Sequence, residues 1–326
     1  MKRAIITGIT GQDGAYLARF LLRQGYEVWG TTRDSEIAGT GNLERLGIRA
    51  AVRLESMSLT DFRSILQVVT RIKPDEIYHL AGQSSVGLSF QQPVETLDSI
   101  ANGTLNLLEV LRYLGGGIRL LNAGSGEMFG DTGETRADEQ TPFRPSSPYA
   151  VAKVTSCHLV ATYRQAYGLH ASNAVLFNHE SPLRNQRFVT AKIAVNAIRI
   201  ADELGRGLAP APLVLGNLDI ERDWGWAPEY VEAAWRILQL DAGEDFVLAT
   251  GRPCQLRDFV AGCFAAVGID GASHVVSDRA LFRPTDHRWG RGNPAKAAAL
   301  LGWSAQCAGT EVAKRLVGCL LRKSTD

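Results

Sequence analysis

Long hydrophobic runs are missing from this sequence of 326 residues. No uninterrupted apolar stretch approaches the ~20 residues that a membrane-spanning helix needs. The run Ala4–Thr7, close behind Met1, is too short for the core of a signal peptide. An excess of charge of one sign is also missing: the formal net charge is +1, so no overall field attracts nucleic acid or an anionic membrane. We therefore expect a cytoplasmic protein with no nucleic-acid or membrane partner, and a local site for any anionic ligand.

Paired cysteines and metal-ligand clusters are missing as well. The five cysteines are odd in number and scattered, and they form no CxxC pair. This pattern is typical of reduced, mostly buried thiols rather than of a disulfide or zinc framework. The six histidines show no ligand spacing with the cysteines or with acidic residues, so we expect no metal site.

Short apolar runs alternate with amphipathic segments in the first half of the chain. The strand candidates are Ala4–Thr7, Glu27–Gly30, Val52–Leu54, Glu76–Leu80, Ile118–Asn122 and Ala174–Phe177. The helix candidates are Gly14–Gln24, Asn42–Leu46, Asp61–Ile72, Val94–Leu114 and Tyr149–Tyr167. Strands that alternate with helices of this length predict an α/β fold with a Rossmann-type, doubly wound parallel sheet.

The character of the sequence changes after Asn178, where segments become shorter and arginine clusters with proline and tryptophan. We expect residues 1–177 to form a nucleotide-binding Rossmann domain, to which later segments can return. Residues 178–326 should form mainly a smaller substrate-binding domain. Such a domain would cap the carboxyl ends of the strands, where ligands bind in open α/β sheets.

A glycine-rich turn follows the first predicted strand and opens the first helix. It reads Gly8-Ile9-Thr10-Gly11-Gln12-Asp13-Gly14. Glycines allow a tight turn and let the backbone approach a pyrophosphate, whose charge then lies at the helix N-terminus. The GxxGxxG spacing is that of short-chain dehydrogenases. By its position between strand and helix, the turn predicts a dinucleotide site.

The end of the second strand bears on the choice between NAD and NADP. An NAD site places a carboxylate there for the ribose 2′-hydroxyl, whereas an arginine accommodates the 2′-phosphate of NADP. The strand continues to Arg33 without an acid, although Asp34 follows directly. This arrangement favours NADP.

Tyr149 and Lys153 lie four residues apart at the start of a predicted helix, so both project from one face. A free tyrosine titrates near ~10, too high for a base at neutral pH. A nearby ammonium and a cationic nicotinamide ring would stabilise the phenolate. Tyr149 is therefore the predicted base that takes a hydroxyl proton while hydride leaves the same carbon.

Ser125 and Glu127 follow the fifth predicted strand. A hydroxyl at a strand end is suited to hydrogen bonding the substrate oxygen that becomes a ketone. The carboxylate of Glu127 is the more informative feature, because simple reductases need no second base. A dehydratase must also remove a proton beside the new ketone and expel water from the next carbon, and Glu127 is the predicted residue for that task.

Seven segments together carry a family resemblance: GITGQDGAYLA, LAGQSSVG, SGEMFG, SPYAVAK, LFNHESPLR, GNLDIERDWG and GNPAKA. The sequence resembles the GDP-mannose 4,6-dehydratases, within the extended short-chain dehydrogenases, from residue 3 to about residue 303. NHESP combined with RDWG is much more specific than the YxxxK pair. The resemblance implies a tightly bound NADP that is reduced and reoxidised in each turnover, a GDP-sugar substrate, and a homodimer or homotetramer.

The resemblance also implies residue roles. Ser125, Glu127, Tyr149 and Lys153 would be catalytic. The cofactor would be lined by Gly8, Ile9, Thr10, Gly11, Gln12, Asp13, Gly14, Arg33, Ser58, Leu59, Leu80, Ala81, Gly82, Gln83, Ser84, Tyr149, Lys153, His179 and Arg184. The GDP-sugar would contact Ser85, Glu127, Asn178, Lys192, Arg222, Arg283 and Asp286.

Several positions depart from the family's usual pattern. Ser125 stands where threonine is usual, Gly126 replaces a serine, and Gly124 is unusual. Ser58 replaces the acid that usually meets the adenine. Ala191 replaces an arginine beside Lys192. The segment Thr285–Arg291 differs from the acid and aliphatic run of relatives, and its His287 and Arg288 are candidates to reach further substrate hydroxyls.

The predicted activity is that of a GDP-mannose 4,6-dehydratase. A GDP-heptose 4,6-dehydratase would use the same chemistry on a different sugar. A nucleotide-sugar epimerase or 4-reductase is a second alternative, which Glu127 disfavours. A non-enzymatic NADP-binding regulator is a third alternative. The presence of Ser125, Tyr149 and Lys153 together argues against it.

Overall fold

A seven-stranded parallel sheet forms the centre of the protein, in a computed structural model that describes residues 1–323, 325 and 326. The strand order is β11-β6-β5-β4-β1-β2-β3. The order reverses after β1, as in doubly wound sheets, so the predicted Rossmann-type fold is confirmed. The strands are β1 (Arg3–Thr7), β2 (Glu27–Thr32), β3 (Arg53–Ser56), β4 (Glu76–His79), β5 (Arg119–Ser125), β6 (Ala171–Leu176) and β11 (Phe246–Leu248).

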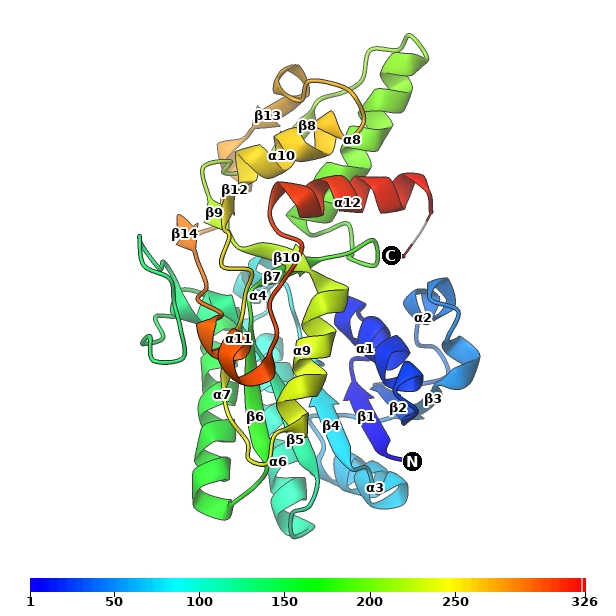
Figure 1. Ribbon diagram of the computed structural model, residues 1–326, viewed down its shortest axis with the longest axis vertical. Coiled ribbons are helices and arrows are strands. Elements are labelled where there is room, and N and C mark those ends of the chain that lie inside the picture. The colour runs from blue at the N-terminus through cyan, green and yellow to red at the C-terminus, as the bar shows by residue number, and fades with distance from the viewer. Residues whose placement is uncertain (324) are drawn as a thin grey trace.

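Helices cover both faces of this sheet (Figure 1). Residues of α1, α9 and α11 pack in one core cluster on one face, and residues of α3, α6 and α7 pack in another cluster on the opposite face. The bounds are α1 (Gln12–Arg23), α2 (Gly41–Arg45), α3 (Phe62–Ile72), α6 (Gly103–Tyr113), α7 (Pro148–Tyr167), α9 (Ala227–Gln239) and α11 (Ala295–Leu301). The segments α9, β11 and α11 lie on the central sheet although they follow residue 178.

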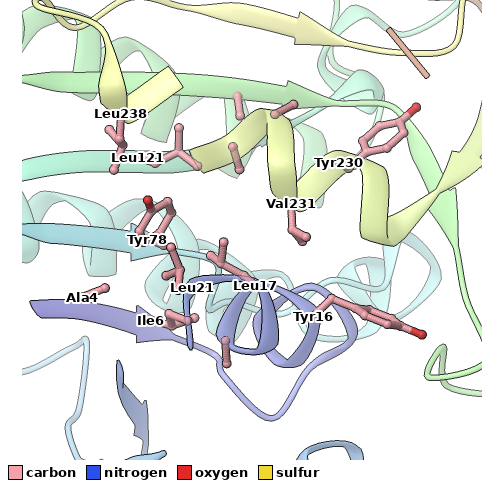
Figure 2. Close-up of a cluster of buried hydrophobic side chains, with 14 of the residues drawn as sticks. Ala4, Ile6, Tyr16, Leu17, Leu21, Tyr78, Leu121, Tyr230, Val231 and Leu238 are labelled. Atoms are coloured by element: carbon pink, nitrogen blue, oxygen red, sulfur yellow. The ribbon is translucent and has the colours of Figure 1, made fainter. Parts of the chain in front are cut away.

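Figure 2 shows the core between α1 and α9. Leu17 and Leu21 of α1 and Val231 of α9 are buried together against the apolar side chains of β1, among them Ile6. Burying one such leucine contributes about 1.5–3 kcal/mol relative to leaving it exposed. This packing fixes α1, and with it the turn between β1 and α1, relative to the sheet.

A second group of helices stacks beyond the carboxyl ends of the strands (Figure 1). It has its own core, in which Trp224, Phe259 and Leu316 are buried. Its elements are α8 (Val189–Gly205), α10 (Leu256–Ala265), α12 (Thr310–Leu321), β8 (Leu213–Leu215) and β13 (Val275–Ser277). Within the described residues, five more short strands form two small sheets: β7 (Asn178–Glu180) with β10 (Trp224–Trp226), and β9 (Glu221–Arg222) with β12 (Cys254–Gln255) and β14 (Trp289–Gly290).

Two expectations about individual elements need correction. The helix predicted over Val94–Leu114 is three segments, namely α5 (Pro93–Leu97), a π-helical turn (Asp98–Asn102) and α6. A π-turn inserts one residue into the helix, and apolar periodicity does not reveal such an insertion. Helix α4 (Val86–Gln91) and strand β11 were not predicted, because six-residue and three-residue elements are too short to show a period.

All five cysteines are free thiols, four of them buried and Cys254 half-buried. This agrees with the expectation of reduced, mostly buried cysteines. Within the described residues, no helix is both long enough and apolar enough to cross a membrane.

Candidate active site

A cavity of about 490 Å³ lies between the carboxyl ends of the sheet strands and the cap. Loops after β4, β5 and β6 form its floor, and α8 with the cap loops forms its roof. Sixteen residues predicted for the site line it: Asp13, Leu80, Gly82, Gln83, Ser84, Ser85, Ser125, Glu127, Tyr149, Lys153, Asn178, His179, Arg184, Lys192, Arg283 and Asp286.

The glycine turn has no room for side chains. Gly8 adopts φ +71°, and a Cβ there would lie 3.0 Å from Cα of Ala81. A Cβ on Gly14 would lie 2.4 Å from the carbonyl oxygen of Gly8. Larger residues would therefore clash at Gly8 and Gly14 in this turn, which lies at the N-terminus of α1, where amide groups and the helix dipole favour an anion. This donor set fits the pyrophosphate of a dinucleotide.

Thr7 and Asp13 tie this turn to the neighbouring strands. The Thr7 hydroxyl accepts hydrogen bonds from the amides of Leu80 and Ala81, both at 3.1 Å. Asp13 lies 2.9 Å from Nε2 of His179. Burial raises the pKa of Asp13, but the pairing with His179 outweighs it and brings the pKa down to about 2. Asp13 is thus an anion that orients His179 at the cavity wall.

Ser125 ends β5, and its hydroxyl caps the short helix η3 (Gly126–Phe129) by accepting from the amide of Glu127 at 3.3 Å. The cap directs the chain so that both side chains reach the same cavity. Packing explains why position 126 is glycine: a Cβ on Gly126 would lie 3.0 Å from the ring of Phe177.

Ser147 and Pro148 set the start of α7. The Ser147 hydroxyl accepts from the amide of Ala150 at 3.1 Å, and proline occupies the first helical turn, where its missing N–H is tolerated. Tyr149 is thereby fixed in the first turn of the helix, and Lys153 lies one turn later. Both side chains are buried and line the cavity.

The ammonium of Lys153 donates to the carbonyl of Ala123 at 2.6 Å and lies 6.0 Å from the centre of the Tyr149 ring. Burial lowers the pKa of Lys153 to about 8. Burial raises the pKa of Tyr149 to about 12, and the Ser125 hydroxyl opposes this rise. In the protein alone the phenol is therefore protonated, because burial outweighs its neighbours. The predicted phenolate also requires the cationic nicotinamide ring, and it stays a prediction.

Arg222 and Asp286 form a buried pair beside the cavity. The guanidinium lies 3.2 Å from the Asp286 carboxylate and donates to the carbonyl of Glu221 at 2.8 Å. Arg222 is 4% exposed and does not belong to the described residues that line the cavity. Arg222 therefore positions Asp286, which lines the cavity.

Other predicted site residues also lie outside the lining. Arg33 is exposed beyond β2, and the carboxylate of its neighbour Asp34 is occupied by the amide of Glu36 at 2.9 Å. His287 and Arg288 do not line the cavity either. The remaining residues outside the described lining are Gly8, Ile9, Thr10, Gly11, Gln12, Gly14, Ser58, Leu59 and Ala81.

Several lining residues were missed. Arg187 and Phe188 precede α8 and reach the cavity, as do Asn217 and Leu281 from the cap loops. No motif marked these positions, because they come from loops whose approach depends on how the cap folds over the sheet.

Comparison with known proteins gives the family. The family model described as GDP-mannose 4,6 dehydratase matches residues 5–316. This chain belongs to that family. It is 41% identical to GDP-mannose 4,6 dehydratase 1 of Arabidopsis thaliana, over 97% of this chain and 89% of the relative. It is 39% identical to GDP-mannose 4,6 dehydratase of Cricetulus griseus, over 97% of this chain and 90% of the relative.

Solved structures agree with the fold. The UDP-glucose 4-epimerase of Thermus thermophilus, in complex with NAD, superposes with a TM-score of 0.83 at 26% identity, covering 97% of this chain and 98% of that one. The DesIV dTDP-glucose 4,6-dehydratase of Streptomyces venezuelae, with NAD bound, has a TM-score of 0.84 at 22% identity and covers 98% and 97% of the two chains.

Proposed function

We propose that this protein is an NADP-dependent GDP-mannose 4,6-dehydratase, which converts a GDP-hexose to a GDP-4-keto-6-deoxyhexose and water. The observation that carries the proposal is the convergence of Ser125, Tyr149 and Glu127 on one cavity beside the dinucleotide turn. An epimerase or reductase needs the first two residues but no third acid–base group. Glu127 is the group that elimination requires.

A nicotinamide held in this cavity would supply hydride transfer, from C4 of the sugar and back to C6. Tyr149 takes the proton of the C4 hydroxyl, and the Ser125 hydroxyl hydrogen bonds the oxygen that becomes the ketone. A bound cationic nicotinamide would favour the phenolate of Tyr149 and would offset the effect of burial on this residue. Lys153 donates to the carbonyl of Ala123 at the strand end, and it would bind the nicotinamide ribose.

Glu127 removes the C5 proton, which the C4 ketone acidifies, and gives a proton to the C6 hydroxyl as it departs as water. The net redox change is zero, so the enzyme is a lyase and needs no external reductant. The GDP moiety would be held near Asn178, Lys192 and Arg283, which line the cap side of the cavity. Arginine presents a fork of donors that matches phosphate oxygens.

NADP is the proposed cofactor because Arg33 follows β2 and is free to meet a 2′-phosphate. Asp34 is the acid that would favour NAD, but its carboxylate accepts a hydrogen bond from the amide of Glu36 in its own loop. We also propose a homo-oligomer, as family membership suggests. Exposed apolar side chains on α5 and α7, such as Val94 and Val151, are suited to contact a second copy.

A substrate panel tests the proposed function. The purified protein should convert GDP-mannose, or a GDP-heptose of the same ring configuration, to a product lighter by one water without added reductant. Activity only with UDP- or dTDP-sugars would show that the nucleotide assignment is wrong. Glu127→Gln should form the ketone and reduced cofactor without losing water, and Tyr149→Phe is the control that should do neither.

A further inference from the structure

His287 contacts Glu127 but is not among the described residues that line the cavity. Its Nδ1 is 3.8 Å from Oε2 of Glu127, and the His287 side chain is 7% exposed. The segment that carries His287 is fixed to the loop after η3. The amide of Arg288 donates to Asp131 at 2.8 Å, and the amide of Thr132 donates to Trp289 at 3.1 Å. The contact between the imidazole and the carboxylate is therefore set by backbone bonds on both sides.

Charged groups surround this imidazole. Arg222 comes from β9, Asp286 from the preceding position, and Asp131 from the loop after η3. Burial and the Arg222 guanidinium lower the pKa of His287 below its usual value, and the carboxylates of Glu127, Asp286 and Asp131 oppose this. Because its pKa is lowered, the His287 imidazolium is a transient species that releases its proton readily.

The proposed reaction requires Glu127 to be protonated twice in each turnover. The first proton comes from C5 and leaves with the C6 hydroxyl as water, which returns Glu127 to a carboxylate. Hydride then arrives at C6 of the 4-keto-5,6-ene sugar, and C5 must gain a proton to complete the product. Tyr149 releases the C4 hydroxyl proton to solvent. One proton is therefore lost at the oxidation step, and one proton must be delivered to C5 at the reduction step.

We propose that His287 supplies Glu127 with this second proton, and thereby acts through Glu127 as a positioning and proton-supply residue of the reduction step. The inference rests on the proposed dehydratase function. The transfer breaks the Nδ1–H bond of an imidazolium and forms an O–H bond on Oε2 of Glu127, and solvent then reprotonates the imidazole. The His287 side chain keeps 7% exposure between the exposed neighbours Thr285 and Arg288, and in the proposed transfer solvent reaches the imidazole through this edge.

The geometry requires only a small adjustment. Proton transfer needs a heavy-atom separation of ~2.6–3.2 Å, and such contacts often tighten when substrate binds. The imidazole lies outside the cavity lining, so it acts on the carboxylate rather than on a substrate hydroxyl. This replaces the expectation that His287 contacts an additional hydroxyl of the sugar.

The test compares His287→Asn with wild-type protein, both assayed as the cofactor-bound enzyme with GDP-mannose in deuterated water. Asparagine keeps a hydrogen-bonding group near the position of Nδ1 but does not titrate. His158→Asn, at an exposed histidine on α7 whose ring contacts Phe143, is the matched control. Rapid-quench mass analysis identifies the sugar that accumulates, and absorbance reports the reduced nicotinamide.

We expect His287→Asn to lower kcat by about 10²-fold, the lower end of general acid–base effects, with little change in KM. The accumulated sugar should already lack water but not yet be reduced at C6. Glu127→Gln should instead accumulate the 4-keto sugar that still carries its C6 hydroxyl. The pH dependence of kcat at acidic pH should change in His287→Asn and not in His158→Asn.

Two results would overturn the proposal: unchanged kcat and pH dependence in His287→Asn, or an accumulated sugar that retains its C6 hydroxyl. Should His287→Asn lose cofactor or unfold, His287→Gln gives the same readout. Failure of the wild-type protein to dehydrate any GDP-sugar would reject the proposed function itself. Normal dehydration by wild type, with a fully active His287→Asn, would reject the role of His287 alone.

Discussion

Replacing Lys153 by methionine should change how the stability of the cofactor-free protein depends on pH. Lys153 is buried, and its ammonium donates to the Ala123 carbonyl at 2.6 Å. Burial lowers its pKa from 10.5 to about 8. Methionine has a similar length and no charge, so the variant removes the titration while keeping most of the volume.

Proton linkage gives the sign of the change in the free energy of unfolding with pH. Between pH 8 and 10.5 the unfolded chain keeps a proton on Lys153 that the folded protein has lost, so the free energy of unfolding rises with pH across this window. Below pH 8 both states are charged, and the full cost of the buried ammonium is present. A change in pKa from 10.5 to about 8 corresponds to about 3 kcal/mol at ~1.4 kcal/mol for each tenfold change in the dissociation constant.

Denaturant unfolding of both proteins at pH 7 and pH 10 measures this effect. The free energy of unfolding of wild type, relative to Lys153→Met, should rise by about 2 kcal/mol between these pH values. Other titrating groups cancel in the comparison, and so does any constant difference from the lost hydrogen bond. If the two proteins respond to pH in parallel, the buried lysine is solvated and the reasoning fails. Lys153→Met should be inactive at both pH values.

Three further outcomes can be checked directly. Tyr149→Phe should abolish turnover yet keep the cofactor bound, as seen by absorbance of the purified protein, because the phenol hydroxyl lies outside the phosphate turn. Arg33→Ala should weaken NADP binding by about tenfold or more, the scale of one charged hydrogen bond, and leave NAD binding unchanged in a titration. Gly126→Ala should lower the melting temperature, since its Cβ meets the ring of Phe177 at 3.0 Å, and an unchanged value would mean that the ring gives way freely.

The elements that carry a clear period were predictable from the sequence. The stripe of α3, which includes Ile65 and Val69, and the alternation of strands with helices were sufficient for the central sheet. The break of the Val94–Leu114 segment by a π-turn was not, because an inserted residue leaves no apolar signature. Strand β11 also escaped prediction, since its place beside β6 depends on pairing across more than 70 residues of sequence.

Some features of the candidate site were likewise predictable from the sequence, and others were not. Ser125, Glu127, Tyr149 and Lys153 follow strand ends or a helix start, so their meeting at one cavity could be foreseen. The contact of His287 with Glu127 could not, because it arises from β14 pairing with β9 and from the bond of Arg288 to Asp131. The raised pKa of Tyr149 in the protein alone was not predicted, since burial is not visible in a motif.

In the proposed reaction, oxidation at C4, loss of water and reduction at C6 occur in one cavity without net redox change. Incubating the purified protein with GDP-mannose deuterated at C4, and locating the label in the product, tests it most directly. We expect a product lighter by one water that carries the deuterium at C6, formed without added reductant. A dehydrated product without the label at C6, or a product that keeps its C6 hydroxyl, would contradict the proposed reaction.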